Sequence, residues 1–284
     1  MNKLLIAGLV LLVVLVGISA IVAMMGSDSL PIGEKVALLK IEGPIVDSDK
    51  TIEELKGYAD DATVKAIVVR VNSPGGAVAP SQEIYEEIKK AAETKKVVAS
   101  MGAVAASGGY YIAVSANKIV ANPGTVTGSI GVIVEVPNIE GLMQKVGIKS
   151  DVIKSGRHKD IASMFRTMTP EERALLQGVV DDIHDQFVNA VAVARKLPVE
   201  KVRRIADGRV FSGRQAKELG LVDELGDQRD AINLAAKLAG ISGEPKVITK
   251  KEKTSLFEML KGMFDGDISG KLLPGFGIKY MMVP

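Results

Sequence analysis

The chain has 284 residues, of which 47% are hydrophobic and 25% charged, enough for one large domain or two small ones. Its 36 basic and 34 acidic residues give a net charge of +2 without a basic stripe, which argues against a nucleic-acid partner. The absence of cysteine excludes disulfides and thiolate chemistry, and two histidines are too few for a multi-histidine metal site. We therefore expect no metal and no cofactor.

The N-terminal region predicts a membrane anchor. Residues 4–25 carry no charge, and as a helix they would span about 33 Å, close to the hydrocarbon thickness of a bilayer. Lys3 precedes the segment, so we expect a single-pass cell-membrane protein with a cytoplasmic N-terminus and an extracytoplasmic body. A cleaved signal peptide is the alternative, although the apolar run is longer than the usual signal core. Residues 1–30 are then anchor and linker, 31–245 the folded domain and 246–284 a tail.

The first half of the folded domain alternates predicted strands and helices. Residues 66–71 are rich in β-branched side chains, as expected for a strand buried on both faces. The alternation predicts parallel βαβ units. Strands are expected at 36–39, 66–71, 97–101 and 118–120, and helices at 51–60, 81–94 and 110–114.

Helices predominate in the second half. Thr169, Pro170 and Glu172 are typical of a helix start, with a capping threonine, a proline at the first position and acidic residues in the first turn. This helix is expected to run to about Lys196. The later elements are expected as helices at 198–206, 212–219 and 230–239 and a strand at 210–211.

Three stretches are candidates for chemistry. Asn72–Gly76 follows a buried strand, and its glycines leave N–H groups uncovered, as in an oxyanion hole, a phosphate cradle or an ordinary tight turn. Ser107 lies in a small-residue turn between a strand and a helix, where N–H groups favour negative charge, although a capped helix start has the same pattern. Lys154–Asp160 contains four basic residues that could serve a site, and the alternative is an ordinary solvated loop.

A serine hydroxyl needs a base to act as a nucleophile at neutral pH. His158 is one candidate, and Lys159 is another if burial and neighbouring groups lower its pKa. His184 lies in a predicted helix and is expected to be a partly buried surface histidine. These residues alone leave the choice of base open.

Four motifs in this order resemble the signal peptide peptidase A family: Asn72–Gly76, Ala105–Tyr110, Thr127–Gly131 and Lys154–Asp160. Asp207–Ala216 and Leu219–Asp223 resemble the same family, so the resemblance covers roughly residues 35–238. It implies the Clp protease/crotonase fold, an α/β architecture of repeated ββα units, preceded here by one transmembrane helix. It also implies a short-form, membrane-anchored serine protease, with 31–245 as the protease domain, that degrades remnant signal peptides after their release from secreted preproteins.

The resemblance also assigns roles to individual residues. Ser107 is the expected nucleophile and Lys159, 52 positions later, the expected general base. Gly76 and Gly108 are expected to supply the oxyanion N–H groups, and Ser129 to orient the lysine amine. The expected partners are signal peptides and other hydrophobic peptides, the lipid bilayer, and further copies of the chain in a homo-oligomeric ring.

Two apolar segments bear on these partners. The stripe formed by Leu175, Val179, Ile183 and Phe187 fits either packing on its own domain or contact with another copy. The apolar end of the tail, 280–283, needs a surface, a membrane or a cleft, and we expect it to occupy a substrate groove of its own or a neighbouring chain. An outer surface or the bilayer is the alternative.

Small apolar residues around Val78, Ala79 and Ala103 indicate a hydrophobic pocket. Three other functions remain as alternatives. A membrane-bound protease of the same fold acting on a specific membrane-protein partner usually has a shorter serine-to-lysine spacing and lacks the motif at 208–216. An acyl-CoA enzyme of the crotonase fold rarely has an N-terminal anchor, and an inactive scaffold would not react with a fluorophosphonate.

Overall fold

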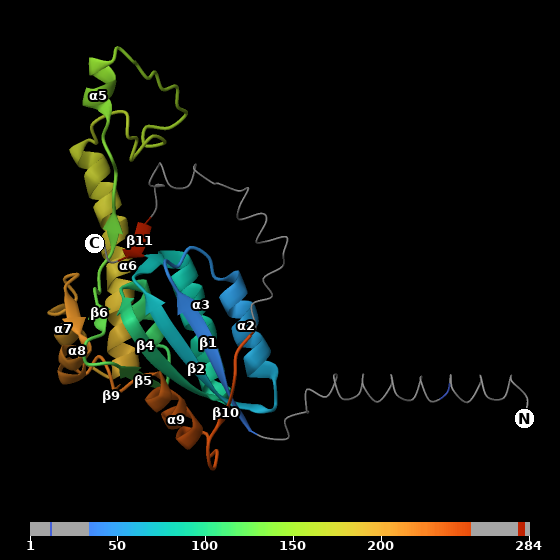
Figure 1. Cartoon of the computed structure of the whole chain (residues 1–284). Coiled ribbons are helices and arrows are strands. Elements are labelled where there is room, and N and C mark those ends of the chain that lie inside the picture. The colour runs from blue at the N-terminus through green and yellow to red at the C-terminus, as the bar shows by residue number, and fades with distance from the viewer. Residues whose placement is uncertain (1–11, 13–33, 251–277, 282–284) are drawn as a thin grey trace, which may run out of the picture. The chain divides into compact units, whose positions relative to one another are not determined.

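The structure is a computed structural model that describes residues 12, 34–250 and 278–281. From Lys35 onward strands and helices alternate along the chain (Figure 1). The strands are β1 (Lys35–Glu42), β2 (Val64–Ser73), β3 (Gly75–Ala77), β4 (Lys96–Ala106), β5 (Lys118–Ala121), β6 (Val126–Gly128), β7 (Ile133–Val134), β8 (Val210–Ser212), β9 (Glu224–Leu225), β10 (Lys246–Ile248) and β11 (Ile278–Met281). The helices are α2 (Asp49–Asp60), α3 (Val78–Thr94), α4 (Gly108–Ala113), α5 (Glu140–Lys145), α6 (Pro170–Arg195), α7 (Val199–Arg203), α8 (Gly213–Leu219) and α9 (Gln228–Leu238).

The main sheet is predominantly parallel. Six of its strands lie in the order β10-β1-β2-β4-β5-β9, and every neighbouring pair in that order is parallel. β6 also runs parallel to β4, and β8 pairs with β6 in the antiparallel sense. This arrangement confirms the prediction of a mixed α/β chain built on a parallel sheet.

Helices cover both faces of this sheet, which explains why β2 is buried along most of its length. On one face, Val36, Val68 and Val98 pack against alanines of α9. On the other face, the larger core includes side chains of α2, α3, α4 and α6. Because both faces are apolar, the central strands read in the sequence as nearly continuous hydrophobic runs.

The capped start predicted for the long helix is present. Thr169 accepts a hydrogen bond from the Glu172 N–H, Glu172 accepts one from the Thr169 N–H, and Pro170 occupies the first turn. The helix ends at Arg195, where Lys196 takes a left-handed conformation with φ 53°. α6 is therefore specified at both ends by its own sequence.

Among the described residues, no helix combines the length and apolar composition that a membrane crossing requires. The transmembrane segment predicted at 4–25 lies outside the described residues apart from Leu12. Residues 251–277 and 282–284 of the predicted tail also lie outside them. The described tail residues 246–248 and 278–281 form β10 and β11, which pair with β1 and with β3 and β7.

Candidate active site

Ser107 stands in a strained turn between β4 and α4. Its backbone angles are φ 53° and ψ −118°, a conformation that non-glycine residues rarely adopt and that costs of order 1–3 kcal/mol. The side chain is buried, and the Oγ atom has no hydrogen-bond partner among the described residues. Strained strand-to-helix turns of this kind present a serine at a helix N-terminus in many hydrolases.

The glycines around Ser107 are required by close packing. A methyl group on Gly108 would lie 2.7 Å from Ser81 Oγ, and one on Gly109 would lie 2.8 Å from the Ser73 carbonyl oxygen. Gly108 is the first residue of α4, so its N–H has no partner within the helix. A free N–H beside the serine hydroxyl is suited to stabilising an oxyanion.

The glycine loop after β2 lies directly against this turn. Gly75 has φ 99°, and a methyl group on it would lie 2.6 Å from the Gly108 nitrogen. Gly76 is equally enclosed, since a methyl group there would lie 2.0 Å from the Ile45 carbonyl oxygen. Two of the three predicted stretches are therefore brought together, and Gly76 and Gly108 belong to adjoining segments.

Ser129 also lies beside the serine turn. The Ser107 N–H donates to the carbonyl of Gly128 at 2.8 Å, which fixes the end of β6 against the end of β4. Ser129 is buried and has φ 51°, and its N–H donates to the Arg209 carbonyl at 2.8 Å. The hydroxyl predicted to orient the base is thus close in the fold to the predicted nucleophile.

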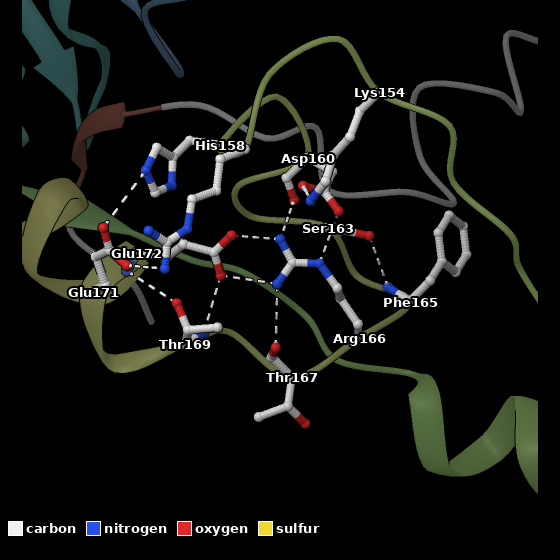
Figure 2. Close-up of polar contacts among 11 residues, drawn as sticks. Lys154, His158, Asp160, Ser163, Phe165, Arg166, Thr167, Thr169, Glu171 and Glu172 are labelled. Carbon is white, nitrogen blue, oxygen red and sulfur yellow. Dashed lines mark hydrogen bonds and ion pairs between the residues drawn. The ribbon is translucent and has the colours of Figure 1, made fainter.

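Lys159 lies on a different part of the chain, in the segment 135–169 that we call the arm. Its loop contacts the first turn of α6, where Arg157 pairs with Glu171 at 2.6 Å and His158 Nε2 lies 3.7 Å from the same carboxylate (Figure 2). Lys159 itself is exposed. Both candidate bases therefore sit at the N-terminal end of α6.

The serine turn is connected to a point further along that helix, past its middle. The Tyr111 N–H donates to the Ser107 carbonyl, and the Tyr111 ring packs on Phe187 of α6 with 5.0 Å between centroids. Glu171 and Phe187 are 16 positions apart, which is about 24 Å along an α-helix. The contacts of the described residues thus connect the Lys159 loop and the Ser107 turn to separate points of α6. His184, on the same helix, lies 2.7 Å from the Ala206 carbonyl oxygen.

A strand of the tail lies across the glycine loop. β11 pairs antiparallel with β3, with Tyr280 opposite Gly76, and also antiparallel with β7. A methyl group on Gly75 would lie 2.1 Å from the Tyr280 carbonyl oxygen, and one on Gly108 would lie 3.1 Å from it. The tail backbone therefore passes the serine turn as an extended strand.

The Tyr280 side chain fills an aromatic pocket. Its ring is fully buried and lies 5.2 Å from the Tyr111 ring and 4.8 Å from the Phe187 ring. Its hydroxyl donates to the Ile183 carbonyl at 3.1 Å, and burial raises the pKa of this hydroxyl. Sequence reasoning looked for an apolar pocket around Val78 and missed these aromatic residues, because they come from segments far apart in the chain.

The predicted apolar stripe on α6 is buried in its C-terminal half and exposed in its N-terminal half. Phe187 is fully buried and Ile183 packs on the core, whereas Leu175 and Val179 are 47% and 44% exposed. Further large apolar side chains are exposed on the arm. These are Leu142, Val146, Ile148, Val152, Ile153 and Phe165.

Comparison with known proteins identifies related sequences. The family model for peptidase family S49 matches residues 89–242, and that for Clp protease matches residues 40–126. A Synechocystis sp. protein named as a candidate protease is 49% identical over 209 residues, which cover 73% of this chain and 76% of the relative. Protease 4 of Salmonella typhi is 41% identical over 73% of this chain. A candidate signal peptide peptidase SppA of Enterococcus faecium is 35% identical over 79% of it.

The matched region spans different shares of these relatives. It covers 69% of the Enterococcus faecium protein but only 35% of Protease 4.

Proposed function

Because this chain belongs to peptidase family S49 and is a serine protease, we propose that it is an endopeptidase that cleaves extended hydrophobic peptides, remnant signal peptides among them. We further propose that residues 4–25 anchor it in the cell membrane, with the protease domain outside the cytoplasm. In this position the enzyme meets hydrophobic peptides as they leave the bilayer.

One observation carries the substrate proposal. β11 lies antiparallel along β3 with the aromatic ring of Tyr280 in the pocket and its backbone carbonyl beside the Ser107 turn. A substrate added as a strand to β3 would have its backbone held in the same way, with its side chains alternating between the two sides. Extended, apolar peptides fit this arrangement.

Ser107 and the adjoining glycines have the features that acyl transfer needs. In the proposed reaction Ser107 Oγ attacks the peptide carbonyl carbon, and the amine of Lys159 takes the hydroxyl proton. The N–H groups of Gly108 and Gly76 stabilise the resulting oxyanion. The lysine then protonates the leaving amine, and water hydrolyses the acyl-enzyme with the lysine again as the base.

We propose that Lys159 of one copy serves Ser107 of a neighbouring copy in a homo-oligomeric ring. The separation along α6 supports this proposal, since the arm holds the lysine far from the serine turn of its own chain. The exposed apolar side chains of the arm and of Leu175 and Val179 support it as well, because large apolar surfaces generally mark contact sites. Ser129 would then orient the incoming lysine.

Mixing experiments test the dyad and the assembly together. Ser107→Ala and Lys159→Ala should each abolish hydrolysis of a fluorogenic hydrophobic peptide, whereas His158→Ala should retain most activity. Co-expression of the two inactive full-length variants should restore activity if the dyad forms between copies. An active Lys159→Ala variant would refute the lysine assignment. Mixtures that stay inactive while a tag on one variant co-purifies the other would refute catalysis between copies.

A further inference from the structure

Arg166 of the arm lies between the carboxylates of Asp160 and Glu172, and none of these three side chains has a role in the reaction proposed above. Arg166 Nη1 and Nη2 donate to both carboxylate oxygens of Glu172, at 2.8 and 2.5 Å. Its Nε donates to the Asp160 carboxylate at 2.8 Å, and Nη2 also donates to the Asp160 backbone carbonyl at 3.1 Å. Figure 2 shows the guanidinium between the two carboxylates.

This arrangement connects the Lys159 loop to the start of α6. Asp160 directly follows Lys159, and Glu172 is the residue that completes the cap of the helix with Thr169. The side chains of Asp160 and Glu172 are only 12% and 5% exposed, so their contacts with Arg166 are shielded from water. A planar guanidinium can bind one carboxylate through two parallel hydrogen bonds while its Nε binds a second carboxylate, a fork geometry that an ammonium group lacks.

The carboxylates of the lysine loop and of the first turn of α6 all have basic partners. Lys154 pairs with Asp160 at 2.5 Å, and Arg157 pairs with Glu171 at 2.6 Å. Hydrogen bonds from Arg166 and Lys154 hold the pKa of Asp160 well below its usual range, and hydrogen bonds from Arg166 and Thr169 lower that of Glu172 to about 2. Lys159 makes no ion pair with any described residue.

We propose that Arg166 is a positioning residue for Lys159: it fastens the lysine loop to α6 and occupies the two carboxylates that would otherwise be free to pair with the lysine. The proposal rests on the proposed role of Lys159 as the base. A general base must lose its proton before it acts, and an unpaired carboxylate within about 4–6 Å would hold that proton in place. The charged and titratable groups on the loop, on the arm residues bonded to it and on the first turn of α6 are Glu140, Lys154, Arg157, His158, Asp160, Arg166, Glu171, Glu172 and Arg173.

The pH dependence of kcat tests this inference in the full-length protein. Arg166→Gln removes the guanidinium from Asp160 and Glu172 and leaves them only their contacts with Lys154 and Thr169, so the rise of kcat with pH should move to higher pH by roughly one unit, and kcat near neutrality should fall roughly tenfold. Asp160→Asn removes a negative charge beside the lysine and should move the rise to lower pH. KM should stay within about twofold in both variants, because neither side chain lies along the β3 strand.

Two further variants keep the test specific. Arg166→Lys keeps the charge without the planar fork, and it should recover part of the shift in the pH profile. Arg173→Gln is the matched control, because Arg173 is an exposed arginine in the same first turn of α6 with no ion pair among the described residues. It should leave both kcat and its pH dependence unchanged.

The inference fails if Arg166→Gln, with its melting temperature and oligomer size preserved, shows the wild-type pH profile or only an equal loss of kcat at every pH. If Arg166→Gln does not fold, a wild-type profile in Asp160→Asn overturns it instead. An active Lys159→Ala variant defeats the proposed function itself. An inactive Lys159→Ala with unshifted Arg166→Gln and Asp160→Asn profiles defeats only the role of Arg166.

Discussion

Truncation of Tyr280 should open the groove beside Ser107. The ring is fully buried against Tyr111 and Phe187, and the hydroxyl has a hydrogen bond to Ile183. Removing a buried aromatic side chain costs about 3–5 kcal/mol. If this loss falls on the docking of the tail, occupancy of the groove decreases by a factor of roughly 10² to 10⁴ in Tyr280→Ala. Tyr280→Phe loses only the hydroxyl contact, about 0.5–1.5 kcal/mol, which is a factor of roughly 2 to 10.

The effect can be measured as binding in the absence of cleavage. In a Ser107→Ala background, a fluorescent hydrophobic peptide competes with the tail for β3, so its apparent Kd should be lowest with Tyr280→Ala, intermediate with Tyr280→Phe and highest with the tail intact. Gly57→Ala, which adds a methyl group to α2 where the Cβ has open space, should change nothing. An apparent Kd that is equal or higher in a folded Tyr280→Ala protein would show that the tail strand and the peptide do not share this site.

Three other variants test separate parts of the structure. Gly75→Ala places a methyl group 2.1 Å from the Tyr280 carbonyl oxygen and 2.6 Å from the Gly108 nitrogen at a φ of 99°, so the rate of peptide hydrolysis should fall by a factor of roughly 10² or more. The control Gly57→Ala, with open space at its Cβ, should keep full activity. Activity of Gly75→Ala within twofold of wild type would contradict this reasoning. Arg166 lowers the pKa of Glu172 to about 2 from an ordinary value of 4.5. The contribution of ionised Glu172 to the stability of the folded protein is therefore complete above pH 4.5 and is lost as the pH falls toward 2. The melting temperature of the wild type should therefore fall more steeply than that of Glu172→Gln over this range, and parallel curves would contradict the assignment. Arg195→Met removes the partner at 2.8 Å from the largely buried Asp223, which keeps Lys118 at 3.4 Å and the Ile119 N–H, and should lower the free energy of unfolding in urea by about 2 kcal/mol. A loss below about 1 kcal/mol would be too small for the ion pair described.

Much of the fold was predictable because local patterns specify it. The buried runs of β1, β2 and β4 and the capped start of α6 are written in consecutive residues, and the structure has strands and a helix at these places. The short strands β3, β6 and β7 were not predicted, since two or three residues carry no periodicity. Their positions depend on pairing with partners distant in the chain.

The candidate site was predictable only as a set of segments. The turns at Ser107, Gly76 and Ser129 follow successive strands of the parallel sheet, whose carboxyl ends meet at one edge, so their proximity follows from the topology. The position of Lys159 depends instead on where α6 carries the arm. No local pattern fixes that distance. The aromatic pocket was missed for a similar reason, because Tyr111, Phe187 and Tyr280 are separated by 76 and 93 positions.

The uninterrupted α6 also fixes the direction in which the arm points relative to the aromatic pocket. It runs without a break for 26 residues, with the arm bound near Glu172 and the pocket packed at Phe187. One residue inserted between these points would rotate the arm by about 100° and advance it by about 1.5 Å, whereas seven would nearly restore its direction but lengthen the span by about 10 Å. Insertions of equal size in the exposed loop before α6 would change neither quantity. The chain should therefore tolerate changes of length in that loop and reject them in the helix.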